Sequence, residues 1–452
     1  MLRFNKAWLL LAGATALLTL AAVACGGGDN GEEGTKTPSA TGTAAVTQQP
    51  TGTATAEGTQ TPATGVTDSS KFDNPDIGLP PGKIILGAHF VQTGTYGAAF
   101  SPVLSGIQAY FKYVNEEKGG VCGRQIDYKA YDDQYDPSKA VEATRRLVEQ
   151  DKIFAMISGL GTAAHSAVWD YLNEKGIPDL WIMTGAHKWN DPQGHPWSVG
   201  FLPDYLVEGT IVGKWIAQNM PNAKVGILYQ NDDWGADVLA GLKDGLGPGN
   251  ELVAEQSYES TAVDVRSQVT NIKQKGAEVV MCACLPGTDA QLVKSAEALG
   301  WDPQIIIDYV ASDPIMFSYA SPKLMEGVLT LQANKLSTWD DDPAVAWHKE
   351  IMKKYGTVAP GNYTMVGQVV GQLTEEVLKR SCNNLTRQGL MDAVNSLKDF
   401  AAPPDQAMTL PGVSTTITKD DHLVTRAMRF LRAKLVDNKG VWEYEGELIS
   451  FR

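Results

Sequence analysis

Hydrophobic and polar positions form alternating blocks along residues 83–452, and the blocks come in two lengths. Short apolar runs of strand length, such as KIILGAHF at residues 83–90, alternate with amphipathic segments of helix length, such as residues 98–118. Further strands are expected at residues 126–131, 153–158, 178–183, 224–229, 251–258, 278–284, 304–308 and 327–332. Further helices are expected at residues 137–150, 162–175, 204–219, 234–244, 264–275, 288–299, 342–355, 361–380 and 386–397. Two β-like stretches, residues 422–435 and 441–451, end the chain.

Strand–helix alternation of this length predicts an α/β fold in which parallel sheets are covered by helices. The strands are too many for one sheet, so two doubly wound parallel-sheet lobes are expected. An internal similarity supports two lobes: the segments that begin at Ile153 and Val279 share the order strand, Gly-Thr loop, helix, Gly turn and strand. Ligands of open α/β sheets bind beyond the carboxyl ends of the strands, so a binding site is expected in the loops there.

Residues 1–24 have the layout of an export signal peptide. Arg3 and Lys6 give a basic start, residues 7–24 carry no charge, and small residues precede Cys25. The small residues followed by a cysteine resemble the lipobox of bacterial lipoproteins, although Ala22 stands where leucine is usual. We therefore expect Cys25 to become the lipidated N-terminus of the mature chain. Ordinary signal cleavage and a plain membrane anchor are the alternatives.

The segment from Cys25 to residue 70 is expected to be a disordered tether. It is dominated by Thr, Gly, Ala, Pro and Ser, and residues 26–70 contain no aromatic residue, Leu, Ile or Met. Such a segment has nothing to bury, so ordering it would cost chain entropy without a compensating gain. A flexible linker between a lipid and a folded domain fits this composition.

Composition and charge exclude several classes of function. The 452 residues carry a formal net charge of −14, which argues against a nucleic-acid partner because phosphates require a basic surface. The sequence contains no G-x-S-x-G, H-E-x-x-H or P-loop motif, and no His/Cys cluster has the spacing of a zinc site. We therefore expect neither enzymatic activity nor a metal or other cofactor.

Several segments resemble the solute-binding proteins of branched-chain amino acid and amide ABC importers, which form the leucine/isoleucine/valine-binding protein family. The resemblance extends over nearly all of residues 83–452 and rests on the combined order and spacing of the segments. It implies a type I periplasmic-binding fold, with two lobes joined by a three-crossover hinge. Lobe 1 would comprise residues 83–203 plus 334–411, and lobe 2 residues 204–333 plus 412–452. The segments are GAHFVQTGTYGAAF, GGVCGRQIDYKAYDDQYDPSKAVEATRRLVEQDKIFAMISGLGTA, GIPDLWIMTGAHKWNDPQGHPWSVGFLPDY, KVGILYQNDDWGADVLAGLKDGL, and LTRQGLMDAV with LPGV near the C-terminus.

The resemblance also implies a function. Proteins of this family close on a small ligand between their lobes and deliver it to a membrane permease. We expect this chain to capture a branched-chain amino acid, a related amide or a small carboxylate for an ABC importer, with the permease and ATPase subunits as partners. It would act as a monomer, lipid-anchored to the outer face of the cell membrane. A ligand-sensing lipoprotein of the same fold, without transport, and an extracytoplasmic hydrolase are the alternatives.

The family's ligand contacts fall in loops after the expected strands. The acid that holds a substrate ammonium in leucine-type binders aligns with Tyr309, one place after Asp308. This departure from the family pattern puts an α-amino acid ligand in doubt and leaves a small acid or amide without an ammonium open. The helix start at Thr162 offers free N–H groups, which favour a carboxylate. Thr162 as a helix cap and Trp234 as a packing residue are the simpler alternatives, and His165 could face either way. The implied contacts are Tyr96, Gly161, Thr162, Ala163, Thr184, Gly185, Ala186, His187, Trp234, Asp308 and Tyr309.

The resemblance places Cys122 and Cys382 together in lobe 1, in polar loops or at helix ends. Because export permits disulfides, we expect these two cysteines to be bonded. Cys282 and Cys284 lie in an apolar strand of lobe 2, so buried free thiols are expected there.

Overall fold

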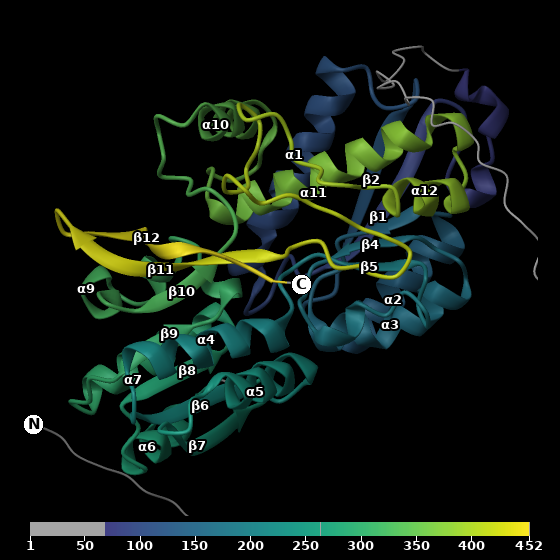
Figure 1. The fold of residues 1–452 in the computed structure, drawn as a ribbon. Coiled ribbons are helices and arrows are strands. Elements are labelled where there is room, and N and C mark those ends of the chain that lie inside the picture. The colour runs from purple at the N-terminus through teal and green to yellow at the C-terminus, as the bar shows by residue number, and fades with distance from the viewer. Residues whose placement is uncertain (1–67, 263, 452) are drawn as a thin grey trace, which may run out of the picture. The chain divides into compact units, whose positions relative to one another are not determined.

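The computed structural model describes residues 68–262 and 264–451, whose elements are labelled in Figure 1. The expected signal peptide (residues 1–24), the expected lipidation site Cys25 and most of the expected tether lie outside these residues. None of the helices in the described part combines the length and apolarity that a membrane crossing requires.

Two sheets organise the described residues. The first has the strand order β2-β1-β3-β4-β5, all parallel. The second has the order β12-β11-β10-β9-β8-β6-β7, in which β6 to β10 are parallel and the β11–β12 hairpin is antiparallel to β10. The bounds are Lys83–Phe90 (β1), Gln125–Asp132 (β2), Ala155–Ile157 (β3), Asp179–Ile182 (β4), Ser198–Gly200 (β5), Lys224–Gln230 (β6), Glu251–Tyr258 (β7), Val279–Ala283 (β8), Gln304–Ile307 (β9), Leu329–Gln332 (β10), Ala427–Val436 (β11) and Lys439–Ser450 (β12).

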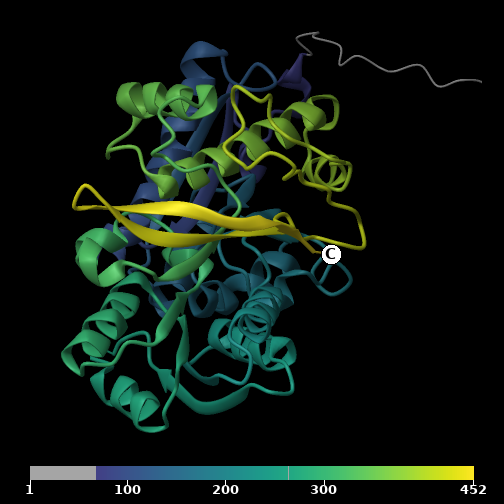
Figure 2. The same cartoon turned by 60° about the vertical axis from the view of Figure 1, so that its left-hand side comes forward.

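Helices cover both sheets, and we call each sheet with its helices a lobe. Lobe 1 contains α1 (Gly97–Glu117), α2 (Pro137–Arg145), α3 (Thr162–Glu174), α10 (Pro343–Tyr355), α11 (Asn362–Ser381) and α12 (Arg387–Val394). Lobe 2 contains α4 (Tyr205–Asn219), α5 (Asp233–Gly245), α6 (Arg266–Gln274), α7 (Pro286–Ala298), α8 (Met316–Tyr319) and α9 (Pro322–Met325). Although α10 and α11 come late in the chain, both pack against α1 (Figure 1). Figure 2 shows the β11–β12 hairpin in yellow at the edge of the second sheet.

Both lobes repeat one topology. The first sheet has the strand order β2-β1-β3-β4-β5, and the parallel strands of the second sheet have the order β7-β6-β8-β9-β10. In both, the second strand along the chain lies at the edge, and the first, third, fourth and fifth follow in that order. The internal similarity noted in the sequence therefore matches β3–α3–β4 with β8–α7–β9. The glycine turns agree as well, since Gly176 (φ 59°) and Gly300 (φ 58°) both have the left-handed backbone that ends a helix. The expected α/β fold with two doubly wound lobes is confirmed.

Acidic caps fix several helix starts. Asp136 accepts hydrogen bonds from the N–H groups of Ser138 (2.8 Å) and Lys139 (3.1 Å) ahead of α2, whose first residue is Pro137. Asp342 caps α10 in the same way, again with proline at the first helical position. The Asp340–Asp342 run therefore includes a helix cap, as its proline-flanked sequence indicates.

The chain passes between the lobes three times: from β5 to α4, from β10 to α10, and before β11. The lobe boundaries expected from the sequence stay proposals. Two contacts favour a third crossover after residue 425 rather than at 411, since His422 Nδ1 lies 2.7 Å from the Ser198 carbonyl and Thr425 donates to the Phe201 carbonyl (2.7 Å). At the other end, Ser69 accepts hydrogen bonds from Arg124, which favours a tether that stops before residue 68.

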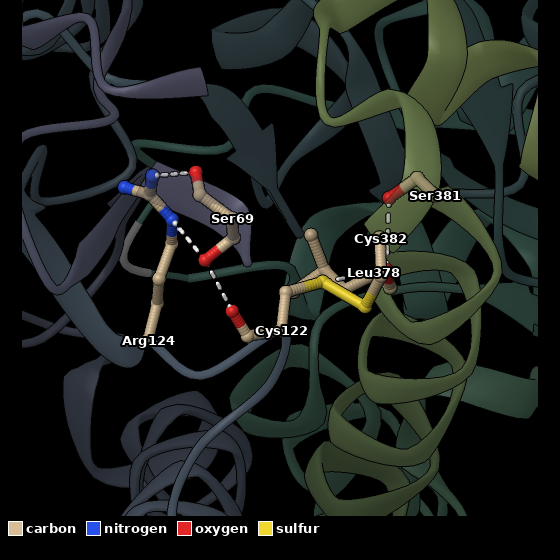
Figure 3. The surroundings of a disulfide bond; sticks show 6 residues. All are labelled: Ser69, Cys122, Arg124, Leu378, Ser381 and Cys382. Atoms are coloured by element: carbon tan, nitrogen blue, oxygen red, sulfur yellow. Dashed lines mark hydrogen bonds between the residues drawn. A yellow bond between two sulfur atoms is a disulfide. The ribbon is translucent and has the colours of Figure 1, made fainter. Parts of the chain in front are cut away.

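Cys122 and Cys382, which were expected to pair, form a disulfide between the loop before β2 and the end of α11 (Figure 3). Cys282 and Cys284 are fully buried, but they also form a disulfide, so the expectation of free thiols was wrong. Residues two apart in a strand face the same side, and this brings the two sulfur atoms into one space.

Candidate ligand-binding site

A cavity with about 580 Å³ of empty volume lies where loops from the two sheets meet. Most of its walls follow the carboxyl ends of strands: β2, β3, β4 and β5 in lobe 1, and β6, β8, β9 and β10 in lobe 2. This is the switch-point position at which open α/β sheets bind ligands. The lining residues are Phe100, Val103, Tyr135, Leu160, Gly161, Thr162, Met183, Thr184, Leu202, Tyr205, Trp234, Leu285, Tyr309, Val310, Ser312, Gln332, Tyr363 and Val366.

Lobe 1 presents hydrogen-bond donors at the start of α3. Gly161 precedes the helix with φ 99°, and a Cβ there would lie 2.8 Å from the Tyr135 ring, so glycine is needed on both counts. Within the described part of the chain no side chain caps α3, which leaves its first N–H groups free for an anion. The Thr162 and Thr184 hydroxyls lie 2.5 Å apart and both are buried. One hydroxyl donates to the other, and the Thr184 side chain also hydrogen-bonds to the Tyr205 phenol.

Lobe 2 contributes a flat aromatic wall. Trp234 lies at the start of α5, where Asp232 caps the helix by accepting from the Gly235 N–H (3.3 Å). Its indole is only 2% exposed, and it packs on the ring of Tyr205 with the ring centroids 5.7 Å apart. Tyr205 follows the cap residue of α4 in the same way. Both aromatic rings are thus held in place at helix starts beside the cavity.

The cavity carries no charge of its own. Among the described residues that line it there is no Asp, Glu, Lys, Arg or His. Buried carboxyls neighbour its walls: Asp308 precedes Tyr309, and Glu208 accepts from the Tyr309 N–H (2.6 Å). Burial raises the pKa of Glu208 to about 8 and that of Asp308 well above its usual range. Burial thus favours the neutral form of both groups, which makes them poor counter-charges for a cation.

Several hydrogen bonds join the two lobes around the cavity. One of them ties the start of α11 to lobe 2, since the Tyr363 hydroxyl donates to the Val310 carbonyl (2.6 Å). The lobes thus meet around the cavity in a closed arrangement. The other bonds run from Tyr96 Oη to the Ser260 carbonyl, from the His187 N–H to Asp237 Oδ2 (2.8 Å), from Lys188 Nζ to Asp233 Oδ2 (2.5 Å) and from Gln230 Nε2 to Tyr135 Oη (3.4 Å).

A family model described as periplasmic binding protein matches residues 83–440. The chain belongs to the periplasmic binding protein family. An amino acid binding protein of Pseudomonas aeruginosa is 26% identical over 274 residues, and the match covers 55% of this chain and 65% of that protein. The resemblance seen in the sequence is therefore confirmed. Members of this family are solute-binding proteins that act outside the cytoplasm, with ABC transporter permeases.

Solved structures of periplasmic binding proteins agree with the fold. A branched-chain amino acid ABC transporter protein from Thermus thermophilus with bound valine superposes with a TM-score of 0.70 at 21% identity, covering 81% of this chain and 96% of that one. A fatty acid ABC transporter substrate-binding protein from Thermomonospora curvata superposes with a TM-score of 0.71 at 24% identity, covering 83% and 95%.

The structure places the residues expected from the sequence at different distances from the cavity. Gly161, Thr162, Thr184, Trp234 and Tyr309 line it together. Tyr96 and His187 do not line the cavity, but each forms a hydrogen bond to the opposite lobe. Ala163, Gly185, Ala186 and Asp308 adjoin lining residues without lining the cavity themselves. The first five stay proposed ligand contacts.

Sequence reasoning missed several aromatic residues of this periplasmic binding protein's cavity. Tyr135 follows β2, Tyr205 starts α4, and Tyr363 lies at the start of α11. A usable signal was present, since each of them occupies a strand end or helix start, as Trp234 does. Gln332 carried the same signal, because it is the last residue of β10, whereas Phe100 lies inside α1.

Proposed function

We propose that this chain captures a small molecule with an apolar body and a carboxylate or uncharged polar head, and delivers it to an ABC importer. The uncharged, aromatic cavity between the lobes carries the proposal. Apolar ligand surface would be removed from water by Phe100, Tyr205 and Trp234, and the Gly161–Thr162 helix start would receive the head group. Closure and binding would be one equilibrium, because the ligand contacts both lobes.

A zwitterionic amino acid suits this cavity poorly. Its ammonium would be buried without a counter-ion, and burying an unpaired charge is costly. Burial raises the pKa of the carboxyls nearest the lobe 2 wall, Asp308 and Glu208, and so favours their neutral forms. The Thermus protein has valine bound, and the Thermomonospora protein is named for fatty acids. Of these two kinds of ligand, the uncharged cavity favours an acid without an amino group.

A matched head-group series tests this function. L-leucine, 4-methylpentanoate, 4-methylpentanamide and 3-methylbutylamine share an apolar body, and L-phenylalanine with 3-phenylpropanoate forms a second set. We expect each deaminated acid to bind about 10- to 150-fold more tightly than its amino acid, as a free-energy difference of about 1.5–3 kcal/mol implies. Calorimetry and ligand-induced thermal shifts measure this. Equal or tighter binding of leucine contradicts the ligand class, whereas loss of uptake in a deletion strain tests delivery to an importer separately.

We also propose that Cys25 carries the lipid that holds this protein, as a monomer, at the outer face of the membrane. The signal layout of residues 1–24 and the Thr/Gly/Ala/Pro-rich segment after it support this. Cells labelled with a palmitate analogue should give a labelled wild-type protein and an unlabelled Cys25→Ala protein. Equal labelling of the two, or no labelling of either, contradicts the anchor.

A further inference from the structure

Four fully buried ionisable side chains form one linear hydrogen-bonded chain through lobe 1. Asp133 Oδ2 lies 2.7 Å from His89 Nδ1, His89 Nε2 lies 2.9 Å from His165 Nδ1, and His165 Nε2 lies 2.8 Å from Asp179 Oδ2. The two imidazole rings are stacked, with their centroids 5.1 Å apart. We call this the Asp–His–His–Asp chain.

The hydrogen bonds of the Asp–His–His–Asp chain require one proton more than two neutral histidines and two ionised aspartates carry. Each of the three contacts needs one hydrogen, but two neutral imidazoles supply only two. Without a third, one of the three contacts would bring two acceptor atoms together without a hydrogen between them. The third proton can reside on an imidazole or on a carboxyl, and in either arrangement the four groups hold three protons and a net charge of −1.

Burial opposes a fourth proton. Desolvation lowers the pKa of His89 although the hydrogen bond to Asp133 raises it, so the neutral form of this ring is favoured. With Asp133 ionised, this ring donates from Nδ1 to Asp133 and accepts at Nε2 from His165. A second charge would remove the acceptor that the central contact requires.

The surroundings supply no other cation to the chain. Within the described residues, the ion pairs of Asp133 and Asp179 are those with the two histidines. Ser198 Oγ lies 3.5 Å from Asp179, and Trp189 packs edge-on against the His165 ring at 5.4 Å. The nearest other titratable groups lie beyond the tryptophans: Lys188 over the Trp189 ring, and His195 stacked on Trp169 with Asp170 and Asp191 as its partners.

The chain is attached to the loops of lobe 1 that line the cavity. Asp133 Oδ1 accepts from the Tyr135 N–H (2.8 Å), and His165 lies one turn into α3, where its N–H donates to the Gly161 carbonyl (2.8 Å). Asp179 begins β4, which leads to Thr184. Gly159 packs on both rings, since a Cβ there would lie 2.4 Å from His165 Nδ1 and 2.8 Å from His89 Nε2.

We propose that the Asp–His–His–Asp chain is a positioning element, in which one trapped proton holds the loops at residues 133–135 and 159–162 in their ligand-binding arrangement. His89 and His165 act through these loops and do not contact the ligand. The inference rests on the proposed function only in taking the cavity as the ligand site. Because the proton stabilises the folded form, its contribution is present at low and neutral pH and is lost as pH rises through the value at which the folded chain releases it.

Nitrogen-15 NMR of histidine-labelled protein tests the proton directly, without a ligand. At pH 7 we expect three N–H protons on His89 and His165 together, or one carboxyl proton in place of the third, with the central proton far downfield and protected from exchange. His89→Gln should remove that signal, because an amide can bridge to His165 without an extra proton. His348→Gln is the matched control: His348 is buried too, but its partners Gln368 and Thr364 are uncharged, and the signal should persist.

Hydrogen exchange measured against pH tests the positioning role in the wild-type protein. Once the central signal is lost at high pH, amides of residues 133–136 and 159–165 should exchange about tenfold faster than the intrinsic pH effect explains, which is the loss of about one charge-assisted hydrogen bond. Amides of β6 in lobe 2 should not change. Two neutral tautomers at pH 7 with no third proton overturn the proposal, and so does loop exchange that ignores the titration. Failure of every ligand to bind would contradict the proposed function and leave these signals unchanged.

Discussion

Replacing Trp234 by alanine is expected to weaken ligand binding by at least about 30-fold, which corresponds to about 2 kcal/mol for a buried aromatic anchor. The indole is 2% exposed, forms part of the lobe 2 wall and packs on Tyr205. Truncation would remove the flat surface on which the ligand body is proposed to lie and would let water into the closed cavity.

Thr162→Ala should weaken binding by about 10- to 150-fold, because it removes the hydroxyl pair with Thr184 at the proposed carboxylate position.

The internal repeat provides matched controls. Thr288 aligns with Thr162 in the internal repeat and lies in the first turn of α7, and it is buried but does not line the cavity. Trp215 packs against Phe430 and does not line the cavity. Thr288→Ala and Trp215→Ala should therefore leave affinity near wild type in calorimetry with 4-methylpentanoate or another identified ligand. Wild-type affinity in both Trp234→Ala and Thr162→Ala, with circular dichroism unchanged, would contradict the cleft assignment.

The fold was accessible from the sequence because its long elements are strongly periodic. The expected helix at residues 98–118 is Gly97–Glu117, and the expected strand at residues 83–90 is Lys83–Phe90. The strand Ser198–Gly200 was missed, since three residues are too few to show a period, and the short helix Met316–Tyr319 was missed for the same reason. The strand β5 completes the first sheet by pairing with β4, and no local sequence pattern predicts this long-range pairing.

The cavity was accessible only where it follows from local rules. A Gly-Thr pair between a strand and a helix predicts donors at a helix start, and Gly161 and Thr162 lie there. Tyr363 reaches the same cavity from α11, about two hundred residues later along the chain. The partners of His165 also come from separate elements, β1 and β4, so its side-chain direction could not be read from the helix pattern alone.

Removing the Cys122–Cys382 disulfide should produce the largest loss of stability among the changes considered. The bond joins residues separated by 260 positions, and chain-entropy estimates for so large a loop reach about 5 kcal/mol, against about 2–4 kcal/mol for typical disulfides. A loss of this size is a large part of the 5–15 kcal/mol by which domains are usually stable. In a urea titration, Cys122→Ser/Cys382→Ser is expected to lower the free energy of unfolding by about 2–5 kcal/mol.

The effect should be local as well as global, because the disulfide lies at a junction. Cys122 belongs to the loop before β2, its carbonyl accepts from the Ser69 hydroxyl (2.5 Å), and Arg124 in the same loop donates to the Ser69 carbonyl (2.5 Å) (Figure 3). Cys382 follows α11, the helix that also carries Tyr363 to the cavity. Cys282→Ala/Cys284→Ala is the control, since its loop spans only two positions and gives little entropic stabilisation. If wild type in reducing agent and Cys122→Ser/Cys382→Ser unfold at the urea midpoint of the oxidised wild type, the disulfide is not what ties α11 to the start of the fold.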